Sequence, residues 1–281
     1  MTKQKPALGL GPIGWLFSEA RSIMMNSKEK AEHFHQLHRP REPLVLFNIW
    51  DPGSAKAVAA GGAKALATGS YSVANAGGYD DGEKTPLDIV IGNLHRIVQA
   101  TDLPVTIDLE RGYGATASGV AASIERTIRA GAIGCNIEDS LPGNGKLRPV
   151  EEQMQRIRLA RTAADDQKLP YFINVRTDVF FQGLPAEQNE AMLASAIERA
   201  QAYAEAGANG IFVPGLADEK LIARLAAAAP LPLNIMVNQK TPSLRNLADA
   251  GVARLSYGPD PYLRMMKLLE AAARDAISIQ H

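Results

Sequence analysis

The chain has 281 residues, 46% of them hydrophobic, and its 30 basic and 30 acidic residues leave no formal net charge. That length fits one large α/β domain or two ordinary ones, and the balanced charge, without a long Lys/Arg run, argues against a nucleic-acid or membrane-surface partner. Cys135 is the single cysteine, which excludes an intrachain disulfide framework and a cysteine-type zinc site. No apolar run approaches the ~20 residues of a membrane span, and residues 1–12 lack the features of a secretory signal, so we expect a cytoplasmic protein.

Short apolar runs recur along the chain after an N-terminal stretch in which Trp15–Leu37 predicts one or two extra helices. The runs have the length of strands and are apolar throughout, as is typical of a parallel sheet covered on both faces. They are Leu44–Trp50, Ala65–Gly69, Val105–Leu109, Cys135–Ile137, Tyr171–Val175, Gly210–Val213, Leu233–Val237 and Arg254–Tyr257.

Helical patterns separate these runs, with apolar residues spaced three and four apart. The clearest are Leu87–Ala100, Ala117–Ala130, Val150–Ala164, Asn189–Ala206 and the Met/Leu-rich Pro261–Ile277. Several end in a glycine just before the next strand, which is typical of a helix C-cap. Eight strand–helix units favour a single (β/α)8 barrel over residues 1–281, with residues 1–43 as an N-terminal helical extension and 260–281 as an oligomerisation helix. A doubly wound open sheet is the alternative.

Polar residues stand where the predicted strands end. The segment Asp108–Gly114 and the pair Glu138–Asp139 end neighbouring strands, so a parallel sheet brings their carboxylates side by side. Acidic oxygens next to glycines that allow sharp turns suit a hard cation such as Mg²⁺. In a barrel, function belongs at these C-terminal strand ends. The full set is Asn48, Asp51, Ser70, Asp108, Glu110, Glu138, Asp139, Arg176, Asp178, Asn234 and Asn238.

Six segments, in order over about residues 44–260, resemble the isocitrate lyase/phosphoenolpyruvate mutase superfamily. They are Asn48–Ala55, Thr68–Ser70, Asp108–Gly114, Gly134–Ser140, Asn174–Asp178 and Phe212–Gly215. The resemblance implies a barrel whose last helix is exchanged with a neighbouring subunit, in a homotetramer built as a dimer of dimers. It also implies a bound 2-oxo acid, or its enolate, on Mg²⁺, with Mn²⁺ as a substitute.

The resemblance also implies roles for individual residues. Asp108 resembles the direct metal ligand, and Asp81, Glu110 and Glu138 resemble the carboxylates that hold the metal's waters. The backbone at Gly69 and Ser70, with the Ser70 hydroxyl, resembles the cradle of the substrate carboxylate, and Arg176 resembles its cationic clamp. Further substrate-binding candidates are Asn48, Asp51 and Asn234, and Tyr71 and a metal-bound water are candidates for the general acid or base.

One loop departs from the superfamily pattern. Isocitrate and methylisocitrate lyases carry a catalytic cysteine in a loop after the Glu-Asp pair, whereas Ser140–Pro149 is shorter and has neither cysteine nor histidine. We therefore expect a carbon–carbon lyase acting on another small 2-oxo or 2-hydroxy acid, with a phosphonopyruvate-type C–P hydrolase or mutase and a 2-oxo acid decarboxylase as alternatives. In the C–P reading, Asn144 and Lys146 would act on the phosphonate. The alternative from another class is a silent barrel that binds a 2-oxo acid.

Simpler structural roles compete with these assignments. Asp51 is equally suited to cap a helix, Ser70 to cap the segment that follows it, and Arg176 to pair with Asp178. Glu110 has Arg111 beside it as a surface partner. Gly77–Gly82 lacks the Lys-Ser/Thr of a phosphate-binding loop, and we interpret it, together with Leu141–Pro149, as a flap that closes over the substrate.

Overall fold

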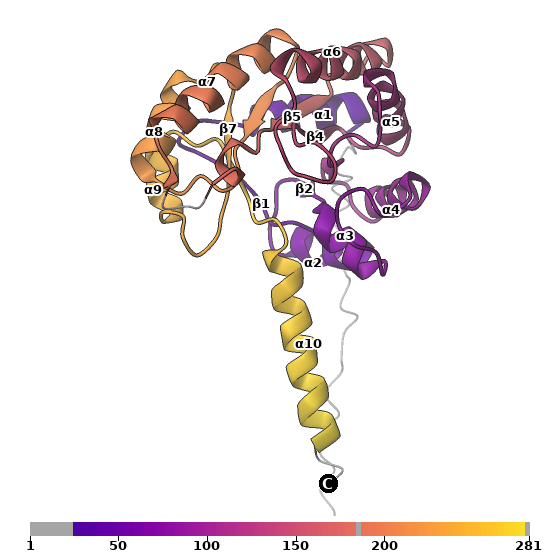
Figure 1. Ribbon diagram of the computed structural model, residues 1–281. Coiled ribbons are helices and arrows are strands. Elements are labelled where there is room, and N and C mark those ends of the chain that lie inside the picture. The colour runs from indigo at the N-terminus through magenta and orange to yellow at the C-terminus, as the bar shows by residue number, and fades with distance from the viewer. Residues whose placement is uncertain (1–24, 184–186, 279–281) are drawn as a thin grey trace, which may run out of the picture.

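A computed structural model describes residues 25–183 and 187–278, and it contains eight parallel strands in the order β1-β8-β7-β6-β5-β4-β3-β2. The two end strands meet through a parallel bridge between Ile49 and Thr68, in which the Ile49 N–H donates to the Ala67 carbonyl (2.9 Å). The sheet is thus a nearly closed ring with helices around it (Figure 1). The predicted (β/α)8 barrel is confirmed, and the open doubly wound sheet is wrong.

Each predicted strand overlaps an observed one. The strands are β1 (Leu44–Leu46), β2 (Leu66–Ala67), β3 (Val105–Asp108), β4 (Gly134–Glu138), β5 (Phe172–Arg176), β6 (Gly210–Phe212), β7 (Leu233–Met236) and β8 (Arg254–Ser256). The helices are α1 (Ser27–Gln36), α2 (Pro52–Ala60), α3 (Ser70–Ala76), α4 (Leu87–Gln99), α5 (Ala117–Arg129), α6 (Val150–Asp166), α7 (Glu190–Glu205), α8 (Glu219–Ala228), α9 (Leu244–Asp249) and α10 (Asp260–Ser278), with a 3₁₀ turn at Val179–Phe181.

Local signals explain where the helices begin and end. Thr116 and Asn189 cap α5 and α7, because each side chain accepts a backbone N–H from the first turn. Gly131 and Gly207 follow the same helices with φ of 98° and 104°, a left-handed conformation that costs glycine little. Short αβ loops of this kind keep each helix against its own strand.

The barrel interior is polar at mid-height. Asn136 on β4 accepts hydrogen bonds from Asn174 of β5 (2.9 Å) and from Arg254 of β8 (3.2 Å). Because β4 and β8 are four positions apart in a ring of eight, the Arg254 contact passes through the interior. Arg254 is almost fully buried, and burial lowers its pKa to about 9.

An apolar plug lies below this layer, at the N-terminal ends of the strands. Phe34 of α1 contacts Phe172 edge-on (5.4 Å between centroids), and His38 stacks on the same ring (4.1 Å). The extra helix before the barrel is therefore present as α1, and its packing explains its amphipathic pattern. The part of the predicted Trp15–Leu37 helices before Met25 lies outside the described residues.

The last helix does not pack on the barrel. α10 projects away from it (Figure 1), and its apolar side chains are exposed: Leu268 by 62% and Leu269 by 63%. Val45 and Phe47, on or just after β1, are also exposed, beside a cavity of about 670 Å³. No described helix is long and apolar enough to cross a membrane.

Candidate active site

Asp108 ends β3 at the mouth of the barrel. Its carboxylate accepts the backbone N–H of Ser70 (3.1 Å), and its own N–H donates to the Thr68 hydroxyl (2.9 Å). The first residue of α3 and the last residue of β3 are therefore tied together. Burial raises the pKa of Asp108, against the lowering effects of Arg176 and of the Ser70 hydrogen bond.

The segment after β3 is held in an unusual backbone conformation. Glu110 and Tyr113 have φ of 49° and 51°, in the left-handed region that residues with a Cβ rarely adopt. Buried Arg156 on α6 holds the turn, donating to the carbonyls of Arg111 (2.6 Å) and Gly114 (2.9 Å). Such backbone conformations cost free energy and persist only where the surrounding structure stabilises them. In proteins they are concentrated at functional sites.

Glu83 ties the glycine-rich loop to this segment, a role that our sequence analysis missed. Its N–H donates to Glu110 (2.6 Å), its carboxylate accepts the Tyr113 N–H (2.7 Å), and its φ is also left-handed at 63°. The stretch interpreted as a flap, Gly77–Gly82, is thus followed directly by a residue that is hydrogen-bonded to the segment after β3. The only hint in the sequence was that an acidic residue, Glu83, directly follows the glycine-rich loop.

Glu110 is a buried carboxyl whose pKa is strongly raised. Its two oxygens accept from Glu83 N–H and from the Tyr113 hydroxyl (3.0 Å), so it does not pair with Arg111. The pKa of Glu110 is raised to about 8, first by burial and then by the negative charges of Asp108 and Asp81. Carboxylates here repel one another.

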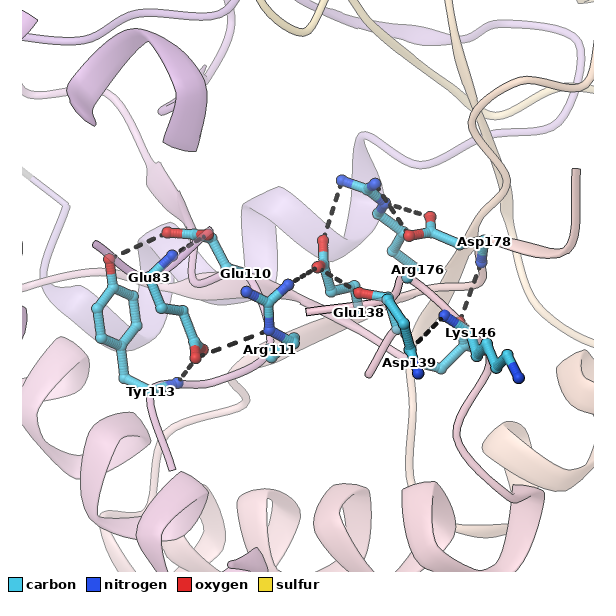
Figure 2. Close-up of polar contacts among 12 residues, drawn as sticks. Glu83, Glu110, Arg111, Tyr113, Glu138, Asp139, Lys146, Arg176 and Asp178 are labelled. Carbon is cyan, nitrogen blue, oxygen red and sulfur yellow. Dashed lines mark hydrogen bonds and ion pairs between the residues drawn. The ribbon is translucent and has the colours of Figure 1, made fainter. Parts of the chain in front are cut away.

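Glu138, at the end of β4, lies between two guanidinium groups (Figure 2). Arg111 approaches one of its oxygens (3.1 Å) and Arg176 the other (3.0 Å), and Ser140 also donates to it (2.6 Å). Glu138 is therefore part of a salt-bridge network with two arginines. The sequence gives no sign that Arg111 turns toward Glu138 instead of Glu110.

Arg176 forms the expected ion pair with Asp178 and a second ion pair with Glu138. Its Nε and Nη2 donate to the two Asp178 oxygens (2.6 and 3.1 Å), while Nη1 faces Glu138. A guanidinium has five N–H donors, so two remain after these three contacts. Burial works against the charge, but Glu138 and Asp178 raise the pKa of Arg176 overall. The clamp assigned to Arg176 must therefore act through the remaining donors.

A buried network behind the site holds Glu138 and Arg176 in place. Asp139, fully buried, accepts from Arg199 (3.0 Å) and Tyr203 (2.8 Å) of α7 with one oxygen and from the Asp178 N–H (3.0 Å) with the other. It therefore links the ends of β4 and β5 to a surrounding helix. Sequence reasoning placed Asp139 at the mouth but did not find these partners, which lie 60 and 64 residues away.

The remaining sequence-predicted residues fall into two groups. Gly69, Ser70 and the partly buried Tyr71 lie at the start of α3 beside Asp108, and the exposed Asp81 is close enough to raise the pKa of Glu110. The other group has structural contacts: Asn48 accepts the N–H of Tyr257 and of Gly258, Asp51 is the N-cap of α2, and fully buried Asn234 accepts from Ser256.

The donor set fits a divalent cation at the mouth. Carboxylates outnumber their ion-pair partners there. Among the described residues, Arg111 and Arg176 make the ion pairs with this group, which comprises Asp81, Glu83, Asp108, Glu110, Glu138 and Asp178. Added positive charge would relieve the repulsion that raises the Glu110 pKa. Among the described residues, no three His, Cys, Asp or Glu side chains converge into a ready-made ligand cluster. A metal bound directly by Asp108, and through water by the others, requires no such cluster.

The barrel, with acidic and polar residues at the C-terminal ends of its strands, defines the class: a (β/α)8 scaffold of the kind that carries enzyme active sites at that end. Residues 34–277 match the phosphoenolpyruvate phosphomutase family, so the chain belongs to that family and to the isocitrate lyase/phosphoenolpyruvate mutase superfamily that its motifs resemble. The named relatives are enzymes of this superfamily and include lyases, as expected.

Three relatives illustrate the range of activities. A structure described as a candidate phosphonomutase from Burkholderia cenocepacia is 53% identical, with a TM-score of 0.87, over 89% of this chain and 100% of that one. A 2-methylisocitrate lyase of Escherichia coli is 33% identical over 196 residues, 66% of this chain and 62% of that protein. An oxaloacetate decarboxylase of Pseudomonas fluorescens is 30% identical over 194 residues, 66% of this chain and 63% of that protein. Both alignments leave more than a third of the curated relative uncovered.

Proposed function

We propose that this protein is a Mg²⁺-dependent carbon–carbon lyase that acts on a small 2-oxo or 2-hydroxy acid through an enolate. The observation that supports it most is the excess of carboxylates around Asp108, with the Glu110 pKa raised to about 8, next to an arginine with two N–H donors left. Such a site attracts a cation, and the cation attracts an acid with two adjacent oxygens.

Asp108 would hold the metal directly, and Asp81, Glu110 and Glu138 would hold its water ligands. When bound, Mg²⁺ (or Mn²⁺) supplies Lewis-acid stabilisation of the negative charge that develops on the 2-oxo oxygen. The chain itself does the rest. Gly69 and Ser70 orient the substrate carboxylate, and the two remaining N–H groups of Arg176 bind it from the other side.

Tyr71 is our candidate proton donor to the carbon released by bond cleavage, since it follows Ser70 and is only partly buried. The loops around Gly77–Gly82 and Leu141–Pro149 would exclude water from the enolate. The first of these is anchored on Glu110 through Glu83, and the second through the Arg148 N–H, which donates to the Asp139 carbonyl (2.7 Å). Both anchors join the loops to the carboxylate segments, so closure and metal binding would be coupled.

The test is a panel of acids with Mg²⁺ and with EDTA. Oxaloacetate, malate and methyl-substituted malates are incubated with the enzyme, and products are identified by NMR. EDTA-sensitive cleavage to a 2-oxo acid and a second carboxylic acid supports the lyase, while loss of CO₂ alone supports the decarboxylase alternative. No EDTA-sensitive reaction with any acid contradicts the proposal and favours the silent barrel.

A C–P bond activity is the second candidate, because the 53%-identical relative is described as a candidate phosphonomutase. It requires extra cations for the phosphonate. Lys146 is exposed, and the buried Arg148 side chain is engaged with Glu152 on α6. We therefore expect oxaloacetate or a malate to be turned over faster than phosphonopyruvate.

We also propose that α10 is exchanged between subunits in a homotetramer. Exposed Leu268 and Leu269 and the uncovered Val45 and Phe47 support it, since apolar patches of this kind mark association surfaces. Gel filtration should give a mass well above the 30.1 kDa of one chain, and L268E/L269E should lower it. A clean wild-type monomer contradicts the exchange.

A further inference from the structure

A row of charged side chains with alternating sign crosses the mouth of the barrel (Figure 2). It starts after the glycine-rich loop and runs to the end of β5, in the order Glu83, Arg111, Glu138, Arg176 and Asp178. The proposed function gives roles to Glu138 and Arg176. It gives none to Arg111, although the Arg111 guanidinium lies beside an acid assigned to the metal's waters.

The Arg111 side chain is held firmly against Glu138. Its Nη1 donates to Glu138 Oε1 (3.1 Å), its Nε lies 3.8 Å from Glu83 Oε2, and only 14% of the side chain is exposed. No described residue accepts a hydrogen bond from the buried Nε. The Arg111 carbonyl is fixed by Arg156 (2.6 Å). Glu138 is therefore the closer of the two carboxylate partners, and Glu83 is the second.

Glu138 has little acceptor capacity left for another group. Each carboxylate oxygen offers two lone pairs. Oε1 accepts from Arg111 and from the Ser140 hydroxyl (2.6 Å), and Oε2 faces Arg176 (3.0 Å). One lone pair remains for a water on a metal, and a single negative charge is shared between two guanidinium groups. A cation that uses Glu138 therefore has to share it with Arg111.

The acids at the end of β3 differ from Glu138 in this respect. Asp108 accepts the Ser70 N–H, and Glu110 accepts the Glu83 N–H and the Tyr113 hydroxyl. Within residues 25–183 and 187–278, neither acid forms an ion pair with a lysine or an arginine. The charge of the β3 acids is thus left for a metal, whereas the acid at the end of β4 already has a cation of the chain beside it.

We propose that Arg111 is a resident cation that competes with the divalent metal for Glu138 and so lowers the affinity of the site for metal. The inference rests on the proposed function, because it assumes the metal site at Asp108. Two cations that share one carboxylate repel each other, and salt screens this repulsion weakly in a partly buried site. A metal that draws on Glu138 leaves Glu83 as the remaining carboxylate partner of Arg111.

The test measures Mn²⁺ binding to the full-length protein without any acid, from the electron paramagnetic resonance signal of free Mn²⁺. R111Q and, independently, R111M remove the charge, and each should bind Mn²⁺ at least tenfold more tightly than the wild type. R111K keeps a positive charge and should stay within threefold of the wild type. The matched control is R129Q, since Arg129 is an ion-paired arginine of α5 that lies outside the row and is 61% exposed. Thermal unfolding checks that each variant is folded.

E138Q shows whether the competition acts through Glu138. With the shared carboxylate removed, the gain from R111Q should fall below threefold when E138Q/R111Q is compared with E138Q. A tenfold gain that persists in this background would mean that Arg111 acts on the metal independently of Glu138, and it would overturn the inference.

The outcomes separate the inference from the proposed function. Equal or weaker Mn²⁺ binding in R111Q and R111M overturns the inference and leaves the metal site standing. If none of the proteins binds Mn²⁺, the metal site fails and the inference fails with it. Tighter binding in both variants, lost in the E138Q background, supports the inference even if no acid of the panel is cleaved.

Discussion

The two ends of the barrel differ in how their buried polar groups are stabilised. At the N-terminal end, His38 donates its Nδ1 proton to the Phe34 carbonyl (2.8 Å) and stacks on Phe172, and burial lowers its pKa to about 3, so that it stays neutral. At the mouth, the partly buried Asp108 and the buried Glu110 are acids that repel each other, and Glu83, Glu110 and Tyr113 have left-handed backbones. One end avoids charge and the other accumulates it.

This difference indicates which end carries function. Charge repulsion and backbone strain lower stability, and proteins keep them where a ligand or a reaction uses them. The strain at the mouth is also local: three of the five described non-glycine residues with positive φ are Glu83, Glu110 and Tyr113. The comparison therefore predicts that changes at the mouth affect activity strongly and stability little, and that the opposite holds at the N-terminal end.

The largest effect is expected for D108N. It removes the negative charge and keeps an oxygen that accepts the Ser70 N–H, so the fold should persist. Turnover of the best acid from the panel should fall at least about a thousandfold, or about 4 kcal/mol of barrier. The unfolding temperature without metal should stay the same or rise, because burial raises the Asp108 pKa and its ionised form is costly in the folded state.

D165N is the matched control, since Asp165 lies on the outside of α6 with a side chain that is 62% exposed. It should leave both turnover and unfolding temperature unchanged. Retained activity in D108N, or a loss of stability without a loss of activity, would remove the functional contrast between the two ends.

The next effect concerns metal and pH at Glu110. Its folded pKa of about 8 lies above the ordinary value of 4.5, so the folded protein holds a proton that the unfolded chain has lost between these values. Stability without metal is therefore fully present below pH 4.5 and declines as the pH rises toward 8. Mg²⁺ at one hundred times its Kd adds about 2.7 kcal/mol, and metal binding favours the ionised carboxylate.

Calorimetric unfolding with and without Mg²⁺ at pH 6 and pH 8 measures this. The Mg²⁺-induced rise in unfolding temperature should be larger at pH 8, and E110Q should flatten its pH dependence. The exposed Glu42 offers the control E42Q, which should behave as wild type. A rise that is independent of pH would mean that Glu110 does not take part in metal binding.

The fold was predictable because its signals are local. Apolar runs of strand length, helices of period 3.6 and glycines after the helices each follow from neighbouring residues, and they placed the starts of α4, α5 and α6 at Leu87, Ala117 and Val150. Most of the strand runs were too long at the C-terminal end, as in Leu44–Trp50 against Leu44–Leu46. Residues after the strand stay buried at the mouth without ladder pairing, and composition alone does not separate the two.

The site was predictable in its residues but not in its pairing. Strand-end position and the order of the motifs placed Ser70, Asp108, Glu110, Glu138 and Arg176 at one mouth, and the structure brings them together. Which guanidinium faces which carboxylate depends on side-chain directions across three loops. The contacts of Glu83 and Arg199 could not be predicted from neighbouring residues, since each acts on a residue at least 27 positions away.

The smallest effect is expected at the N-terminal end, for His38. Its folded pKa of about 3 is below the ordinary 6.5, so the unfolded state takes up a proton that the folded state refuses. Stability is therefore kept at neutral pH and lost as the pH falls below 6.5, by about 2 kcal/mol at pH 5.

H38Q should weaken this acid sensitivity at some cost in stability at pH 7, because Phe172 loses its stacking partner. The control H33Q, on α1 just before His38, should keep the acid sensitivity. Urea titrations at pH 5 and pH 7 compare the three proteins, and turnover at pH 7 should be equal in all of them. Equal acid sensitivity in H38Q would mean that the polar mouth, and not the plug, governs stability in acid, which would reverse the contrast between the ends.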